Sequence, residues 1–199
     1  MKYEIKNCVI VILAAGKSER FGSPKQLIHY RSKSLLLHSV SEAGQATLPL
    51  IVVIGANKSL VENELKGQHV LIAENNKWKE GMSSSLHRGL LAAKGLNDSV
   101  DAIIFMVSDQ PFVSGLLIKN LIETQQKTGL PIVASDYGNG CGVPVLFHKI
   151  FFDEILELTG DTGAKKLIEK YKHLAAFVPF PLGKIDIDTI EDYQTLSQQ

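Results

Sequence analysis

Three cationic side chains stand close together near the start of the chain, directly after a run of small residues. The cations are Lys17, Arg20 and Lys25, and the small residues are Ala14-Ala15-Gly16. Small residues let a ligand approach the backbone closely, and N–H groups in such turns bind anions. Lys and Arg side chains pair with phosphate oxygens. We therefore predict a polyphosphate site, formed by the backbone of residues 14–18 with Arg20 and Lys25. The alternative is a solvated basic loop.

The loop does not match two familiar nucleotide-binding motifs. A Walker loop reads G-x-x-x-x-G-K-[ST], whereas five residues separate Gly16 from Gly22 here and Ser23 follows. The dinucleotide fingerprint G-x-G-x-x-G does not occur in this loop either. These departures disfavour an ordinary ATPase and a nicotinamide-dependent dehydrogenase.

Carboxylates further along the chain predict a metal site. Asp109 follows a largely apolar stretch, and Asp186 and Asp188 alternate with isoleucines. On a strand, such alternation places both later carboxylates on one face. Magnesium prefers protein oxygen ligands together with phosphate oxygens. We expect Asp109 to bind Mg²⁺ and the pair Asp186 and Asp188 to complete the site, the alternative for Asp188 being a cap on the last helix.

These residues must be held by alternating strands and helices. Apolar runs predict strands at residues 8–13, 50–54, 70–73, 101–107, 132–135, 143–147 and 174–179. Helical spacing and capping residues predict helices at residues 34–43, 58–66, 83–94, 114–127, 149–158 and 162–171, and a last helix from Ile190. Residues 74–82 are too polar for regular structure to be expected.

This alternation predicts an α/β fold of three layers, Rossmann-like, with a mostly parallel sheet and helices on both faces. The closely spaced strands between residues 132 and 147 indicate a small antiparallel excursion, and residues 174–179 an edge strand. We expect a single domain over residues 1–199. Ligands of open α/β sheets bind at the carboxyl ends of the strands, where Gly16 and Asp109 both stand.

The composition points to a cytoplasmic protein. The 21 basic and 21 acidic residues cancel, so the overall charge favours neither nucleic acid nor an anionic membrane as a partner. Two cysteines provide neither a disulfide framework nor zinc spacing, which fits a reducing compartment. Residues 1–15 mimic a secretory signal only loosely, because the apolar run is short and Glu4 spoils the basic region. No apolar run is long enough for a membrane helix.

A resemblance to a known family rests on residues 13–25, which read L-A-A-G-K-S-E-R-F-G-S-P-K. They resemble the signature L-A-A-G-x-S-x-R-[FM]-G-x-x-K of the MobA-like nucleotidyltransferases. Further matches are Asn76-x-Trp78-x-x-Gly81-Met-Ser-Ser-Ser-Leu, Ser108-Asp109-Gln110-Pro111, Gly140-x-Gly142-x-Pro144-x-Leu-Phe, Gly160-Asp-Thr-Gly-Ala and Asp186-Ile-Asp188-Thr-x-Glu-Asp. This combination is similar to the molybdenum cofactor cytidylyltransferase branch, including accessory proteins of xanthine dehydrogenase maturation. The first motif alone also suits sugar-nucleotide and isoprenoid cytidylyltransferases.

The resemblance assigns roles to individual residues. It implies that the nucleotide is bound by Leu13, Ala14, Ala15, Gly16, Lys17, Ser18, Arg20, Lys25, Ser83, Ser84 and Asp109. The backbone of residues 13–15 would meet the base, residues 16–20 the phosphates, and Lys25 the reacting phosphoryl group. The catalytic residues would be Lys25, Arg20 and Asp109, and the plain alternative for the serines is a helix cap. The acceptor would lie against Gly140, Gly142, Pro144, Asp161 and Gly163.

The function that the resemblance implies is transfer of a cytidylyl group from CTP to the terminal phosphate of a molybdopterin-type acceptor, with Mg²⁺ as cofactor. A molybdenum hydroxylase such as xanthine dehydrogenase would receive the product. The guanylyl-transferring branch usually has Gly in place of Ala15 and Asn-type residues near Asp186 and Asp188, so this sequence favours cytidine. Two alternatives stay open: a sugar or polyol phosphate as acceptor, and a carrier that binds a molybdenum cofactor without transfer. Trp78 either walls the site or anchors a loop.

Overall fold

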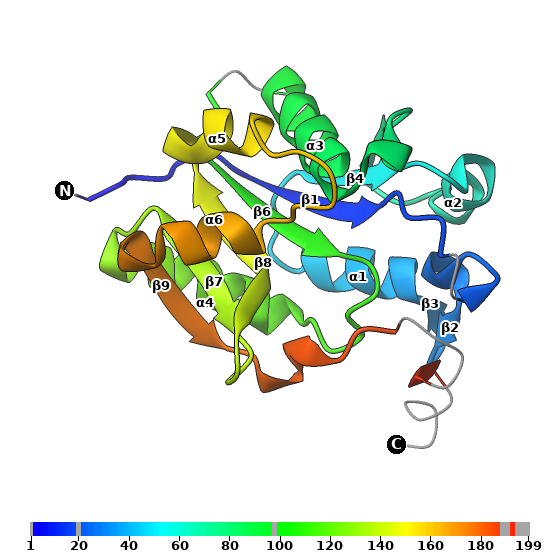
Figure 1. Cartoon of the computed structure of the whole chain (residues 1–199). Helices are drawn as coiled ribbons and strands as arrows, with labels where there is room; N and C mark the ends of the chain where they lie inside the picture. The colour runs from blue at the N-terminus through cyan, green and yellow to red at the C-terminus, as the bar shows by residue number, and fades with distance from the viewer. Residues whose placement is uncertain (1, 19–20, 97–98, 188–191, 194–199) are drawn as a thin grey trace.

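The protein folds around one seven-stranded sheet with the strand order β5-β4-β1-β6-β8-β7-β9 (Figure 1). This computed structural model describes residues 2–18, 21–96, 99–187 and 192–193. The strands of the sheet are β1 (Cys8–Ala14), β4 (Leu50–Ile54), β5 (Leu71–Glu74), β6 (Ala102–Val107), β7 (Ile132–Asp136), β8 (Cys141–His148) and β9 (Ala175–Pro179). A separate small hairpin, which the sequence patterns did not predict, pairs β2 (His29–Tyr30) with β3 (Lys33–Ser34).

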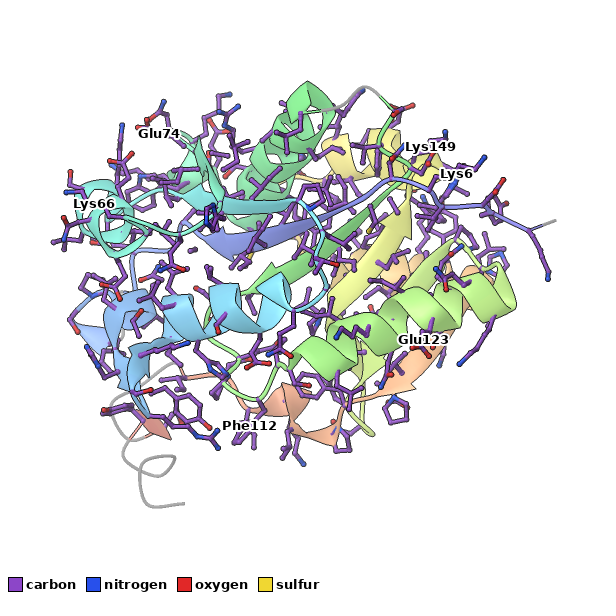
Figure 2. All side chains as sticks on the ribbon, turned by 180° about the vertical axis from the view of Figure 1, so that it is seen from behind. Lys6, Lys66, Glu74, Phe112, Glu123 and Lys149 are labelled. Carbon is purple, nitrogen blue, oxygen red and sulfur yellow. The ribbon has the colours of Figure 1, made fainter. Side chains whose placement is uncertain are left out.

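Helices cover both faces of the sheet. The α-helices are α1 (Leu35–Gly44), α2 (Lys58–Glu64), α3 (Met82–Leu96), α4 (Gly115–Thr128), α5 (Phe152–Leu156) and α6 (Lys165–Lys170). Apolar side chains of α3, α5 and α6 pack in one buried cluster, and those of α1, α2 and α4 pack in the other. The face that α1 and α4 cover is the nearer one in Figure 2. The predicted three-layer α/β architecture is therefore confirmed.

Strand β1 is the centre of this arrangement, and all of its residues are buried. Val9, Val11 and Leu13 belong to one apolar cluster, while Ile10 and Ile12 belong to the other, as strand alternation between two covered faces requires. The strand pairs in parallel with β4 and with β6. Because parallel strands end at the same edge, the turns that follow β1, β4 and β6 lie next to one another.

The second half of the sheet is partly antiparallel. Strand β8 runs antiparallel to β6 and to β7, and β9 pairs in parallel with β7 at the edge of the sheet. The predicted antiparallel excursion and the predicted edge strand are both confirmed. Within the described part of the chain, no helix is long and apolar enough to span a bilayer.

Three local expectations need correction. Residues 74–82 are not entirely irregular, because a 3-10 helix η3 (Trp78–Glu80) lies there and α3 begins at Met82. The expected helices 149–158 and 162–171 are shorter, and the former is divided into the 3-10 helix η4 (Lys149–Phe151) and α5. Residues 185–187 form no strand and follow the 3-10 helix η6 (Pro181–Lys184). The helix expected from Ile190 begins outside the described residues.

At the amino ends of β1 and β6, opposite the turns that follow these strands, the carboxylate of Asp101 joins three segments. Asp101 accepts hydrogen bonds from the backbone N–H groups of Lys6 (3.1 Å) and Asn7 (3.2 Å) and from Lys149 Nζ (2.8 Å). Lys6 and Lys149 accordingly lie close together in Figure 2. Asp101 thereby joins the segment before β1, the start of β6 and the end of β8, and leaves the carboxyl ends of β1 and β6 open for a ligand.

Candidate active site

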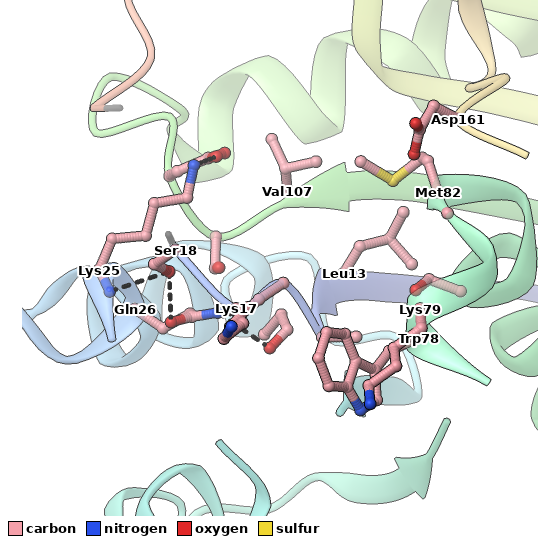
Figure 3. A pocket seen from close by; sticks show the side chains of 17 residues that line it. Leu13, Lys17, Ser18, Lys25, Gln26, Trp78, Lys79, Met82, Val107 and Asp161 are labelled. Atoms are coloured by element: carbon pink, nitrogen blue, oxygen red, sulfur yellow. Dashed lines mark hydrogen bonds and ion pairs between the residues drawn. The ribbon is translucent and has the colours of Figure 1, made fainter. Parts of the chain in front are cut away.

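A cavity of about 670 Å³ lies at the carboxyl ends of β1 and β6 (Figure 3). Its lining residues are Leu13, Ala14, Ala15, Gly16, Lys17, Ser18, Lys25, Gln26, Trp78, Lys79, Gly81, Met82, Ser85, Val107, Ser108, Asp109 and Asp161. The structure thus brings together residues of the loop after β1, the carboxylate after β6 and the start of α3. Arg20 and Asp188, predicted for the same site, lie outside the described residues.

Gln26, a residue of the 3-10 helix η2 (Lys25–Leu27), binds the backbone of the loop after β1. Gln26 is only 2% exposed, and its Nε2 donates to the carbonyls of Gly16 (2.8 Å) and Ala14 (3.2 Å). Ser18, which has a φ of 60°, donates its hydroxyl to Gln26 Oε1 (3.3 Å) and accepts from the N–H of Lys25 (3.1 Å). The two bound carbonyls therefore point away from any phosphate, which they would repel.

The cavity also contains a close ion pair between two predicted catalytic residues. Lys25 Nζ lies 2.5 Å from Asp109 Oδ2, although 84 positions separate the two residues in the sequence. The other carboxylate oxygen, Asp109 Oδ1, is buried and has no hydrogen-bond partner among the described residues. A buried anionic oxygen without a donor suits a hard cation, so the residue fits the predicted magnesium site.

Asp186 is exposed and does not line the cavity, although the residue after it contacts the backbone of Asp109. The prediction that Asp186 and Asp188 project from one face of a strand is wrong for residues 185–187, which have no regular structure. The N–H of Ile187 donates to the carbonyl of Asp109 (3.1 Å), and this bond draws the segment toward the end of β6. Within the described ranges no cluster of three or more metal-binding side chains is found.

The serines at the start of α3 lie mostly behind the cavity wall. Ser83 and Ser84 are buried; the hydroxyl of Ser83 donates to the carbonyl of Gly160 (2.8 Å), and that of Ser84 to the carbonyl of Gly81 (2.8 Å). Ser85 lines the cavity instead. Gly81 has a φ of 96°, and an added Cβ would lie 2.4 Å from the Gly160 carbonyl. The loop around Gly160 is therefore docked directly on the first turn of α3.

Of the five residues expected to face the acceptor, one lines the cavity and four do not. Asp161 lines the cavity, carried there by the docked loop, whereas Gly140, Gly142, Pro144 and Gly163 do not. Gly142 and Pro144 are buried in β8. The Val143–Pro144 peptide is cis, and the carbonyl of Pro144 accepts from Ser135 Oγ (2.8 Å). The turn between β7 and β8 therefore lies outside the cavity lining.

The two ends of the cavity differ in chemistry. Lys25 lies at one end, and Trp78, Met82 and Asp161 lie at the other (Figure 3). The ammonium of Lys79 lies 5.4 Å from the centre of the Trp78 ring. One end thus offers charge to phosphates, and the other an indole that suits a flat ring.

Sequence reasoning missed several residues of this site. Gln26, Lys79, Met82 and Val107 line the cavity without having been singled out. The position of Gln26 beside Lys25 was the only signal for it, since burial of its amide against the loop depends on the folded chain.

The fold and the site together define an α/β protein with a cavity at the carboxyl ends of β1 and β6, lined by the loop after β1 and by Asp109. Residues 10–175 match the family described as MobA-like NTP transferase domain. Because this match spans most of the chain, the protein belongs to the MobA-like NTP transferase family and is a nucleotidyltransferase by family. The predicted family is therefore confirmed.

Two solved structures and one sequence relative are similar to this chain over nearly its whole length. The crystal structure of Rv0371c from Mycobacterium tuberculosis H37Rv is 30% identical, covers 98% of this chain and all of its own, and superposes with a TM-score of 0.81. A complex of Rv0371c with manganese is 28% identical, with the same coverage and a TM-score of 0.76. Nicotine blue oxidoreductase from Paenarthrobacter nicotinovorans is 27% identical over 200 residues, which are 94% of this chain and 92% of that protein.

Proposed function

We propose that the protein transfers a cytidylyl group from CTP to the terminal phosphate of a molybdopterin-type acceptor and releases pyrophosphate. The observation that carries nucleotidyl transfer is the Lys25–Asp109 pair beside the loop of residues 14–18, with Asp109 Oδ1 buried and unpartnered among the described residues. The choice of CTP and of molybdopterin rests on the motif resemblance. A molybdenum hydroxylase, such as xanthine dehydrogenase, would then receive the product in the cytoplasm.

The nucleophile of the transfer is the acceptor phosphate. It is already anionic near neutral pH, so no general base is needed. An oxygen of the acceptor phosphate forms a bond to the α-phosphorus of CTP, and the bond to the bridging oxygen breaks. Pyrophosphate leaves with that electron pair. Lys25 moves its ammonium from Asp109 to the α-phosphoryl group and holds the charge there, and Arg20 supports it.

The backbone of the loop aligns the triphosphate, and Asp109 is freed to hold a metal. Mg²⁺, held by Asp109 with Asp186 or Asp188, would neutralise charge on the triphosphate. The manganese complex of Rv0371c supports a divalent ion in a relative of this chain. The Trp78 end of the cavity, where Lys79 and Asp161 also lie, suits a planar base through stacking on the indole.

The decisive experiment is a grid of the four nucleoside triphosphates against candidate acceptors with Mg²⁺, scored by pyrophosphate release. We expect release with CTP and molybdopterin, and a loss on the order of 10²–10³ in rate for Lys25→Ala and for Asp109→Asn. The exposed residues Lys127 and Asp153 lie on α4 and α5, so Lys127→Ala and Asp153→Asn are matched controls without effect.

Each other outcome would assign a different activity to this protein. Preference for GTP would assign guanylyl transfer, and release only with a sugar or polyol phosphate would replace the acceptor. Exchange of a molybdenum cofactor without consumption of CTP would establish the carrier. Unchanged pyrophosphate release in both Lys25→Ala and Asp109→Asn would refute the catalytic assignment.

Binding can be followed separately from transfer, because Trp78 is the only tryptophan of the chain and lines the cavity. We expect CTP with Mg²⁺ to change the fluorescence of Trp78 in a saturable way, since a bound base would alter the surroundings of the indole. Tripolyphosphate is the control, because it fills the phosphate end without a base. An equal change with tripolyphosphate would contradict a base at the Trp78 end.

A further inference from the structure

A buried side chain, Gln110, and a half-buried one, Tyr137, which the proposed reaction does not use, connect three segments near Asp109. Gln110, the residue after Asp109, is 3% exposed, and its Nε2 donates to Tyr137 Oη (3.1 Å) and to the carbonyl of Gly183 (2.7 Å). Tyr137 in turn donates its hydroxyl to the carbonyl of Val143. One chain of hydrogen bonds therefore joins the end of β6, strand β8 and η6.

The ring of Tyr137 packs directly against backbone on two sides. A Cβ added at Gly142 would lie 2.6 Å from Tyr137 Oη, and one at Gly183 would lie 2.2 Å from Tyr137 Cε1. Phe180 meets the ring edge-on, with 6.1 Å between the ring centres. Contacts this close leave the phenol a single position, so it acts as a spacer between β8 and η6.

The segment of residues 183–187, which carries Asp186, is hydrogen-bonded at both ends to the adjacent residues Asp109 and Gln110. At its start, the carbonyl of Gly183 accepts from the side chain of Gln110, and at its end the N–H of Ile187 donates to the carbonyl of Asp109. Burial raises the pKa of Tyr137 to about 12, so its hydroxyl keeps the proton that it donates to Val143.

We infer that Tyr137 and Gln110 are positioning residues, which set the segment of Asp186 and the turn of residues 138–142 in place relative to Asp109. This inference rests on the proposed function in one respect: Asp109 and Asp186 are taken as metal-binding carboxylates. Neither the phenol nor the amide lines the cavity. They hold the second carboxylate and the acceptor-side turn as one unit with the first carboxylate.

The first test is Tyr137→Phe, which removes the hydroxyl and keeps the ring. We expect the affinity for Mn²⁺, measured by calorimetry on the protein without nucleotide, to fall about 10-fold, because the segment that carries Asp186 would lose part of its support and groups that orient metal ligands typically contribute this much. Exchange of the backbone amides of residues 138–142 and 183–187 should become faster. Tyr171→Phe is the matched control, because Tyr171 Oη bonds Glu154 (2.5 Å) away from this network.

A second variant, Gln110→Met, keeps the side-chain length and removes both donated bonds. It should reproduce the loss of Mn²⁺ affinity, and the effects of the two substitutions should be less than additive in the double variant. In the transfer assay both should raise KM for the acceptor more than KM for CTP.

The inference is overturned if Mn²⁺ affinity in both variants stays within twofold of the unaltered protein while only thermal stability falls, because the network would then be purely structural. It is overturned as well if the unaltered protein binds no Mn²⁺. Neither readout needs turnover, so absence of pyrophosphate release with every pair of substrates refutes the proposed function without deciding this inference.

Discussion

Among the single residues of the site, Gln26 has the widest influence on the loop after β1. A loop that binds phosphate must present N–H groups and turn its carbonyls away, since carbonyl oxygens repel anions. Gln26 meets this requirement with one buried amide that donates to Ala14 and Gly16 and accepts from Ser18. Loss of the amide would leave two carbonyls without a donor and free the loop to turn them toward the cavity.

Gln26→Met, which keeps the volume and removes the hydrogen bonds, should weaken CTP binding about 10-fold, equal to about 1.4 kcal/mol. Stability should fall by about 1–2 kcal/mol because buried acceptors lose their donor. Titration of Trp78 fluorescence and urea denaturation measure the two effects. Gln125→Met is the control: Gln125 is 3% exposed and donates to the carbonyl of Tyr3 (2.6 Å), so only stability should change. Equal CTP affinity in both variants would contradict the role of Gln26.

Among the elements, α3 connects the core to the cavity. Its first turn supplies Met82 and Ser85 to the lining and holds the loop of Gly160 and Asp161. Its middle packs on β1 so closely that a Cβ added at Gly89 would lie 2.5 Å from Val11 Cγ1. A change in this contact must therefore move the helix and, with it, one wall of the site.

Two glycines of the same helix should respond in opposite directions to alanine. Gly89→Ala should lower the free energy of unfolding by about 1–3 kcal/mol, because the added methyl group has no space beside Val11. At Gly95 an added Cβ meets nothing within 4 Å. Gly95→Ala should therefore raise stability by about 0.5–1 kcal/mol through helix propensity. Urea denaturation measures both, and a stable Gly89→Ala protein would contradict the close contact.

On the scale of the whole molecule, the carboxyl ends and the amino ends of the parallel strands have different roles. The carboxyl edge opens into the cavity, while Asp101 at the amino edge ties the N-terminal segment and the end of β8 to β6. The hydrogen bond from Lys149 is the main cause that lowers the pKa of Asp101 below its ordinary value of 3.8. Stability from a carboxylate with a lowered pKa is present above that ordinary value and is lost as pH falls through the folded-state pKa.

Asp101→Asn should destabilise the protein by about 1–2 kcal/mol near neutral pH, because a charged acceptor of three hydrogen bonds is replaced by a neutral one. The difference from the unaltered protein should shrink as pH falls below 3.8 and through the lowered folded-state pKa of Asp101, where the folded carboxylate becomes protonated. Urea denaturation as a function of pH measures this. CTP binding at neutral pH should stay unchanged, and a difference in stability that does not shrink as pH is lowered would contradict the assigned cause.

Much of the fold could be predicted from local patterns. Buried strands, helix periodicity and small residues before cations depend on neighbours in the chain, and they indicated the parallel sheet, the antiparallel excursion and the loop at Gly16. Residues 185–187 were misjudged because alternation of Ile and Asp also occurs in extended backbone that pairs with no strand. The roles of the individual site residues, the base and the acceptor stay predictions.

The sequence by itself determined the family and the order of the elements, and it predicted the end of the strands at which a ligand would bind, because these follow from residue type and spacing. Only the tertiary structure decided which side chains meet. The contact of Lys25 with Asp109, the amide of Gln26 behind the loop, and the bridge from Gln110 to Tyr137 join residues with no sequence pattern in common. Such contacts depend on where strands and helices pack, and burial then leaves each polar group only the partners that packing brings to it.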